Sequence, residues 1–188
     1  MSKFIINGER PLCGELDILG AKNSVLPLLA ACILTDEKII LHNCPNITDV
    51  HNMLAILESL GVYAKFENGN ITIDSSNINS EVVPPKLAHE LRSSIFLLGS
   101  ILSKFNKATL SYPGGCEIGE RPIDIHLKGL KELGVDITEE GGLIFCKNTG
   151  KIKSTEIVLD IPSVGATENL MMASVFAEGI VTLRNVAR

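Results

Sequence analysis

Cys116 is the residue whose surroundings most favour reactivity. It lies in a loop, residues 113–119, that contains three glycines. Because glycine allows many backbone conformations, leaving this loop irregular costs little free energy. We therefore expect its thiol to be exposed rather than packed. Arg121 favours the thiolate, whereas Glu117 and Glu120 favour the protonated thiol, which can donate a proton. The alternative is a glycine-rich turn that happens to hold a cysteine.

Lys22 occupies a second position with possible chemistry. A strand is expected to end at Gly20, and Asn23 or Ser24 is expected to cap the helix that follows. A surface lysine gains nothing from the positive end of a helix dipole, but a phosphate there would be held by the ammonium and by free backbone amides. The spacing is not that of a Walker loop, so nucleotide hydrolysis is not implied. A solvated lysine beside a helix cap is the alternative.

Two further helices are expected to open in the same way. Arg92 begins one at the position equivalent to Lys22, and Ser163, Val164 and Gly165 begin another. A third opens at Arg121 and Pro122, with proline in its first turn. Together these helix ends predict a cationic, amide-rich pocket for an anion.

The elements that must position these residues recur along the chain. Residues 57–73 are echoed by residues 130–145, and each segment predicts a helix ended by glycine and then a hairpin. An apolar helix, a polar turn and a strand recur in residues 21–41, 91–111 and 165–183. The period is about 70 residues, and each unit reads strand, helix, strand, helix, strand, strand. The sequence therefore predicts a mixed α/β domain with threefold internal pseudosymmetry.

The third unit stops before its second helix and hairpin. Its last residues are 185–188, where the other two units continue. A strand and helix without their closing elements would leave apolar surface uncovered, so we expect a fragment of a longer protein. A degenerate third repeat that simply ends there is the alternative.

Composition narrows the class of protein. The chain has 188 residues, a net charge of −5 and 45% hydrophobic residues, as expected for one globular domain rather than a disordered chain. The acidic balance and the scarcity of aromatic residues argue against a nucleic-acid partner. The longest apolar stretch, residues 25–34, is about half of what spans a bilayer, and the N-terminus does not resemble a secretion signal. We therefore expect a soluble, cytoplasmic chain without a membrane partner.

The five cysteines are scattered and do not suggest a metal site. No pair has the C-x-x-C spacing, and the four histidines are not paired at helical spacing. Cys32 and Cys146 lie in apolar runs and are expected in the core.

The motifs together resemble those of the enolpyruvyl transferases. The likeness covers the whole chain, and it is carried by residues 20–23, 91–95, 113–126 and 162–167, of which the Cys116 loop is the most specific. The resemblance implies an inverse α/β barrel fold of two domains, each with three βαβαββ repeats and with the active site between them. Residues 1–20 would then belong with a second domain that is missing here, and residues 21–188 would form the three-repeat domain, with its third repeat truncated.

The resemblance also implies an activity. The enolpyruvyl group of phosphoenolpyruvate would move to the 3-hydroxyl of UDP-N-acetylglucosamine by addition and elimination, releasing phosphate without a cofactor or metal. Cys116 would be the proton donor and the site alkylated by fosfomycin, with Lys22 and Arg121 also catalytic. The implied substrate-binding residues are Lys22, Asn23, Arg92, Arg121, Pro122, Ile123, Asp124, Ile125, Ser163, Val164 and Gly165.

By the same resemblance, the groups that deprotonate the sugar and bind the carboxylate would come from the missing domain. This chain alone is therefore expected to be inactive. A shikimate-type enolpyruvyl transferase is one rival, which the Cys116 loop disfavours. A non-catalytic anion-binding module with a redox-sensitive thiol is the other.

Overall fold

The first repeat forms a small antiparallel sheet covered by helices. The computed structural model describes residues 3–9, 11, 13–114 and 123–187. The first unit contains α1 (Lys22–Ala31), η1 (Cys32–Leu34), β1 (Ile39–Leu41), α2 (Thr48–Ser59), β2 (Tyr63–Glu67) and β3 (Asn70–Asp74). Its strands are in the order β1-β3-β2, and both pairs are antiparallel.

The second repeat has the same topology. It contains α3 (Pro85–Glu90), η2 (Arg92–Ile95), α4 (Phe96–Phe105), β4 (Lys107–Ser111), α5 (Asp124–Glu132), β5 (Val135–Glu140) and β6 (Leu143–Asn148). The strand order β4-β6-β5 repeats that of the first sheet, again with antiparallel pairs. The predicted internal repeat is therefore confirmed.

The third unit pairs its strands differently. It contains β7 (Lys153–Val158), α6 (Val164–Ala173) and β8 (Glu178–Arg184), and β7 pairs with β8 in parallel. Because α6 lies between them in sequence, these three elements form the expected strand–helix–strand unit.

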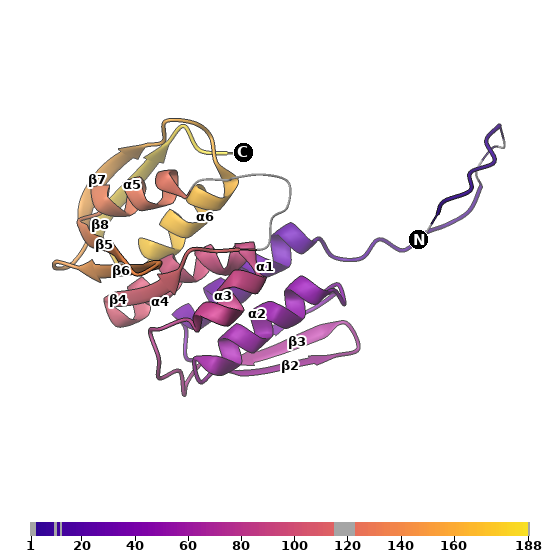
Figure 1. Cartoon of the computed structure of the whole chain (residues 1–188), viewed down its shortest axis with the longest axis horizontal. Helices are drawn as coiled ribbons and strands as arrows, with labels where there is room; N and C mark the ends of the chain where they lie inside the picture. The colour runs from indigo at the N-terminus through magenta and orange to yellow at the C-terminus, as the bar shows by residue number, and fades with distance from the viewer. Residues whose placement is uncertain (1–2, 10, 12, 115–122, 188) are drawn as a thin grey trace.

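The first strand of the predicted unit is well formed only in this third copy. In the second copy it is reduced to one parallel bridge between Val82 and Thr109. In the first copy, residues 13–20 contain no strand, which corrects the prediction of a strand ending at Gly20. A strand needs a neighbour to pair its backbone groups, and none of the described strands lies beside this segment. Figure 1 shows the N-terminal segment projecting away from the body.

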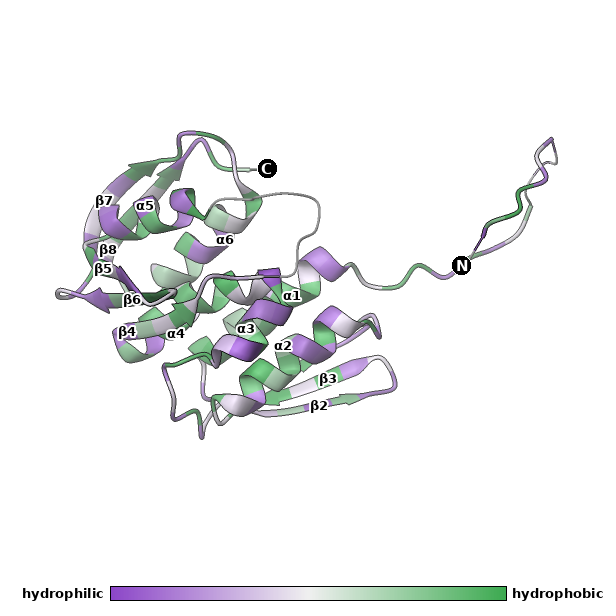
Figure 2. Ribbon diagram, viewed as in Figure 1, coloured by the Kyte–Doolittle hydropathy of each residue, from purple (hydrophilic) through white to green (hydrophobic). Residues whose placement is uncertain are grey.

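The helices pack on one another to form a single core. Helix α4 contacts both α1 and α6, and all six residues from Leu97 to Leu102 are buried. A helix that is apolar on every side is expected to be central, and Figure 2 shows α4 mostly in green. Among the helices that the structure describes, none combines the length and apolar character needed to span a membrane.

Local sequence signals account for the helix ends and hairpins. The Asn68-Gly69 and Gly141-Gly142 turns all have positive φ, as a two-residue type I′ hairpin requires. Helices α2 and α5 are each followed by a left-handed glycine, Gly61 at φ 94° and Gly134 at φ 88°.

The two helix-ending glycines provide a matched test of strain and crowding. Gly134→Ala should cost about 1 kcal/mol of unfolding free energy, since its φ is left-handed but its surroundings are open. Gly61→Ala should cost more, because its new Cβ would also lie 2.8 Å from the carbonyl oxygen of Asn77. Urea unfolding of both variants measures the difference. Equal losses would show that crowding at Gly61 is relieved by backbone movement.

Candidate functional site

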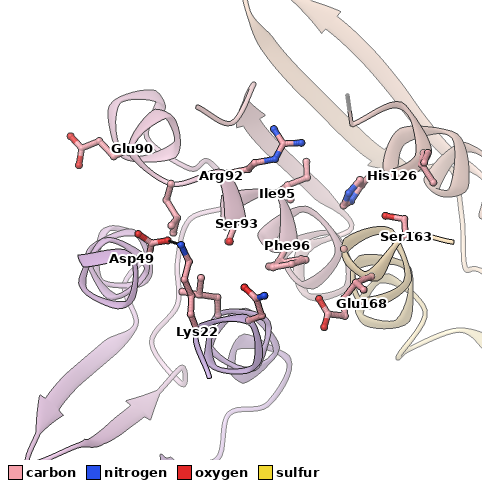
Figure 3. Close-up of a pocket in the computed structure, with 16 residues that line it drawn as sticks. Lys22, Asp49, Glu90, Arg92, Ser93, Ile95, Phe96, His126, Ser163 and Glu168 are labelled. Carbon is pink, nitrogen blue, oxygen red and sulfur yellow. Dashed lines mark ion pairs between the residues drawn. The ribbon is translucent and has the colours of Figure 1, made fainter. Parts of the chain in front are cut away.

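A pocket lies where helices of all three repeats begin. It has a volume of about 600 Å³ and receives residues from the starts of α1, η2, α5 and α6. Figure 3 shows Lys22, Ser93 and Phe96 around the space between these helices, with the Glu90 side chain pointing away from it. The described lining residues are Lys22, Asn23, Leu26, Asp49, Glu90, Leu91, Arg92, Ser93, Ile95, Phe96, Ile125, His126, Ser163, Val164, Gly165 and Glu168.

Lys22 is the first residue of α1 and forms an ion pair with Asp49. The helix is preceded by Ala21, and no side chain caps it, so the prediction that Asn23 or Ser24 is the cap was wrong. Asp49 lies in the first turn of α2, the neighbouring helix. The Lys22 side chain is half-exposed, so its ammonium is held at the pocket wall while remaining accessible to a ligand.

Ser163 caps the helix α6 at the opposite side of the pocket. Its hydroxyl accepts a hydrogen bond from the amide of Ala166 at 3.3 Å. The amides of Val164 and Gly165 lie in the first turn, where N–H groups have no acceptor within the helix. These amides supply the kind of positive helix end that binds anions. Arg92 lines the same pocket from η2.

The described wall holds acidic as well as basic side chains, and Arg121, the third predicted cation, lies outside the described residues. Lys22 and Arg92 are accompanied by three carboxylates, those of Asp49, Glu90 and Glu168. One carboxylate oxygen of Glu168 is buried without a hydrogen-bond partner among the described residues, and burial raises the pKa of this side chain. These carboxylates come from elements whose neighbourhood is set by packing, so the motifs did not reveal them.

His126 is a further lining residue that the sequence argument did not assign to the site. It lies in α5, is 8% exposed and receives a hydrogen bond at Nδ1 from the Asn169 amide at 3.1 Å. Burial lowers the pKa of His126 to about 4, and the nearby positive charge of Arg92 acts in the same direction. The imidazole is therefore neutral over the physiological pH range.

This low pKa makes stability depend on pH. Because the folded-state pKa of about 4 lies below the ordinary value of 6.5, only the unfolded chain takes up the proton between these two values. The contribution of His126 to the unfolding free energy is constant above about pH 6.5, and the unfolding free energy falls as the pH drops from 6.5 toward 4.

When the pH is lowered from 7 to 5, the unfolding free energy of His126→Gln should fall by about 2 kcal/mol less than that of the parent chain. Urea unfolding at both pH values measures the difference, and His89→Gln, at an exposed histidine, is the matched control. A change in unfolding free energy from pH 7 to pH 5 that is the same in His126→Gln and in the parent chain would contradict the prediction.

The structure places the other predicted site residues as follows. Asn23, Ile125, Val164 and Gly165 line the pocket with Lys22, Arg92 and Ser163. The side chain of Ile123 is buried in the core, and Asp124 is exposed at the first residue of α5; neither lines the pocket. Cys116, Arg121 and Pro122 lie outside the described residues.

The cysteines that were expected in the core are there. Cys32 is 3% exposed and Cys146 is 2% exposed. Burial raises the pKa of Cys32 to about 11 and that of Cys146 to about 12, so both thiols are unreactive. In the described parts of the chain, no three histidine, cysteine, aspartate or glutamate side chains are grouped as metal ligands would be.

Curated relatives match the chain along its whole length. A Caldanaerobacter subterraneus subsp. tengcongensis protein named UDP-N-acetylglucosamine 1-carboxyvinyltransferase 2 is 49% identical over 188 residues, or 100% of this chain and 45% of that protein. A Wolbachia pipientis wMel protein named UDP-N-acetylglucosamine 1-carboxyvinyltransferase is 46% identical over 195 residues, or 100% of this chain and 46% of that protein. The chain thus spans about half the length of the curated relatives it matches.

Solved structures and a family model agree on the fold. The enolpyruvyl transferase NikO from Streptomyces tendae has a TM-score of 0.75 at 20% identity, covering 88% of this chain and 39% of NikO. EPSP synthase from Acinetobacter baumannii has a TM-score of 0.66 at 18% identity, covering 93% of this chain and 41% of that structure. The family model described as EPSP synthase (3-phosphoshikimate 1-carboxyvinyltransferase) matches residues 6–188. The chain therefore has the enolpyruvyl transferase fold and belongs to the EPSP synthase (3-phosphoshikimate 1-carboxyvinyltransferase) family.

Proposed function

We propose that this chain is the N-terminal half of a cytoplasmic enzyme that transfers the enolpyruvyl group of phosphoenolpyruvate to the 3-hydroxyl of UDP-N-acetylglucosamine. Such a reaction is the first committed step of peptidoglycan synthesis. The observation that carries the proposal is the convergence of Lys22, Arg92 and the α6 amides on one pocket, in a chain matched throughout by relatives named for this reaction.

The acceptor is chosen on the basis of sequence identity. Relatives named for UDP-N-acetylglucosamine are 43–49% identical, whereas the solved EPSP synthases are 18% identical. A nucleotide-sugar acceptor is therefore favoured over shikimate 3-phosphate. The pocket volume of about 600 Å³ is also within the range of small-molecule sites.

The proposed chemistry is an addition followed by an elimination. A proton is added to C3 of phosphoenolpyruvate while the sugar oxygen attacks C2 and loses its own proton to a base. The resulting tetrahedral ketal then loses a proton from C3 and expels phosphate, which restores the double bond. Cys116 is the proposed proton donor to C3, since a general acid must stand within reach of that carbon.

Charged groups of the chain are proposed to hold the phosphate. Lys22, Arg92 and Arg121 would bind it and stabilise the charge that develops as it departs. Lys22 and Arg92 already face one pocket.

The nucleotide sugar is proposed to contact Asn23, residues 121–125 and the backbone of Ser163, Val164 and Gly165. The capped start of α6 presents amides suited to a diphosphate. Because the side chain of Ile123 is buried, its contact would come from the backbone.

The second domain is proposed to supply the remaining groups. The base for the sugar hydroxyl and the residues that bind the carboxylate would lie in it, and residues 1–20 would pack with it. The exposure of Phe4, Ile6 and Leu16 supports this, because apolar side chains in an extended segment are normally covered by a partner surface. The chain alone is then expected to be inactive.

Fosfomycin labelling of the full-length enzyme tests this function. We expect one adduct, on Cys116, with a rate that depends on UDP-N-acetylglucosamine, and no adduct in Cys116→Ser. Exposed Cys13 is an internal control for non-specific alkylation. Mass spectrometry that finds label on Cys13, or no label, would favour the non-catalytic anion-binding module. Turnover with shikimate 3-phosphate but not with UDP-N-acetylglucosamine would favour the shikimate-type rival.

A further inference from the structure

A buried chain of hydrogen bonds runs from α4 through α6 to His126. The backbone N–H of Gly99 donates to Oδ1 of Asn169 at 2.7 Å. This bond identifies the oxygen of the Asn169 amide, so the group facing His126 at 3.1 Å is the NH₂. Asn169 is fully buried, and its amide therefore has one orientation that satisfies both neighbours.

This arrangement determines where the proton of His126 lies. Nδ1 accepts a hydrogen bond from Asn169, so in the neutral ring the hydrogen must be on Nε2. No hydrogen bond from Nε2 is found among the described residues, and this nitrogen is not one of their buried unpartnered atoms, so its N–H opens into the pocket that His126 lines. A donor that opens into a pocket is available to an acceptor supplied by a ligand.

The Nε2 edge of the ring faces the first turn of α6. A Cβ placed on Gly165 would lie 3.4 Å from Nε2, so this nitrogen lies beside the first turn of α6. Figure 3 shows the ring between Arg92 and Ser163.

We propose that His126 is a ligand-binding residue that donates from Nε2 to a phosphoryl oxygen, and that Asn169 is the positioning residue that fixes its tautomer. The inference rests on the proposed function, in which the two substrates carry a diphosphate and a phosphate. It adds a neutral donor to the charged groups and amides already placed there. It also gives the buried amide of Asn169 a role in recognition, exerted through another side chain.

A neutral donor keeps its hydrogen-bonding pattern when pH changes. The charged groups around the ring are Arg92 and Asp124, which act on its ionisation in opposite directions, and Lys22 and Glu168, which line the same pocket. Protonation of the ring would place a hydrogen on Nδ1, against the NH₂ of Asn169. The Asn169 contact therefore reinforces the neutral Nε2–H form.

Nitrogen-15 NMR of the histidine rings in the 188-residue chain tests the tautomer directly. The chain has four histidines, and His126→Gln assigns the relevant signals. We expect a protonated Nε2 and an unprotonated Nδ1 in His126, unchanged from pH 8 to pH 5. Asn169→Asp keeps the acceptor for Gly99 but turns the donor into an acceptor, so it should move the hydrogen to Nδ1. Asn148→Asp adds the same charge at an amide outside the pocket, bonded to Asn106, and should leave His126 unchanged.

Ligand titrations of the full-length enzyme, followed by the same NMR signals, test the donor role. UDP-N-acetylglucosamine, phosphoenolpyruvate and inorganic phosphate are added separately, and the one that shifts the Nε2–H signal identifies the source of the phosphoryl oxygen. Asn169→Asp should weaken binding of that ligand about tenfold or more. In a His126→Gln background this loss should be much smaller, because Asn169 then has no ring to orient. The comparison therefore separates the effect of the His126 tautomer from the effect of the charge that Asn169→Asp adds.

Two results would overturn the inference. An Nδ1–H tautomer in the parent chain would do so, as would ligand shifts at Lys22 or the α6 amides with none at His126. The second result would leave the proposed function intact. No shift at any of these groups with any of the three ligands would count against both.

Discussion

In the full-length transferase proposed above, Lys22→Ala is expected to lower kcat/KM for phosphoenolpyruvate by about 10²–10³-fold, the usual effect of removing one preorganised charge-stabilising group. Lys22 is held at the start of α1 by its ion pair with Asp49, facing the pocket that also contains Arg92. A phosphate entering there would meet an ammonium already in place. Because charge on the phosphate grows as it leaves, the loss should appear in kcat as well as in KM.

The control for Lys22 is another ion-paired lysine of the same repeat. Lys65 is paired with Glu67 at 2.9 Å, about half-exposed, and outside the pocket. Lys65→Ala removes the same charge and should leave the kinetics unchanged. Steady-state kinetics with both substrates varied measures the effect. Equal activity of Lys22→Ala and the parent enzyme would remove Lys22 from the mechanism.

Gly99→Ala is expected to destabilise the fold by about 3 kcal/mol or more, at the upper end of what overpacking costs. Gly99 lies in the middle of α4, where this helix crosses α6. An added Cβ would lie 2.2 Å from the backbone oxygen of Asn169 and 2.5 Å from its side-chain oxygen. The backbone oxygen cannot turn aside, and the side-chain oxygen is buried and bonded to the Gly99 amide, so the two helices must separate. Urea or thermal unfolding of the purified chain measures the loss.

Gly150→Ala is the matched control for this substitution. No atom lies within 4 Å of a Cβ added there, so the variant should be within about 0.5 kcal/mol of the parent. Gly99→Ala should also disturb the His126 signals, since Gly99 holds the Asn169 amide. A Gly99→Ala chain as stable as the parent would mean that α4 and α6 are not in close contact in solution.

The repeated architecture could be predicted because its signals are local. Glycine at the end of α2 and α5 and the Asn68-Gly69 turn specify backbone conformations that other residues rarely adopt. Apolar runs likewise indicated the central helices and the burial of Cys32 and Cys146. Each of these features depends on residues close together in the chain. For the same reason, the helix starts at Lys22, Arg92 and Ser163 could be predicted from the sequence.

The strand predicted before Gly20 shows where local signals fail. The residues before it alternate in a way that favours a strand, yet the described segment has none, because strand formation depends on a neighbour that the local sequence does not contain.

What the sequence by itself determined is the helices and hairpins of the repeat and the helix ends that bear Lys22, Arg92 and Ser163. Only the tertiary structure decided that these ends share one pocket with Asp49, Glu168 and the His126 ring. The tautomer of that ring depends on contacts between residues 43 and 70 positions apart in the chain. Charge balance and hydrogen-bond direction in a pocket are set by which side chains packing brings together, and no local pattern along the chain encodes that proximity.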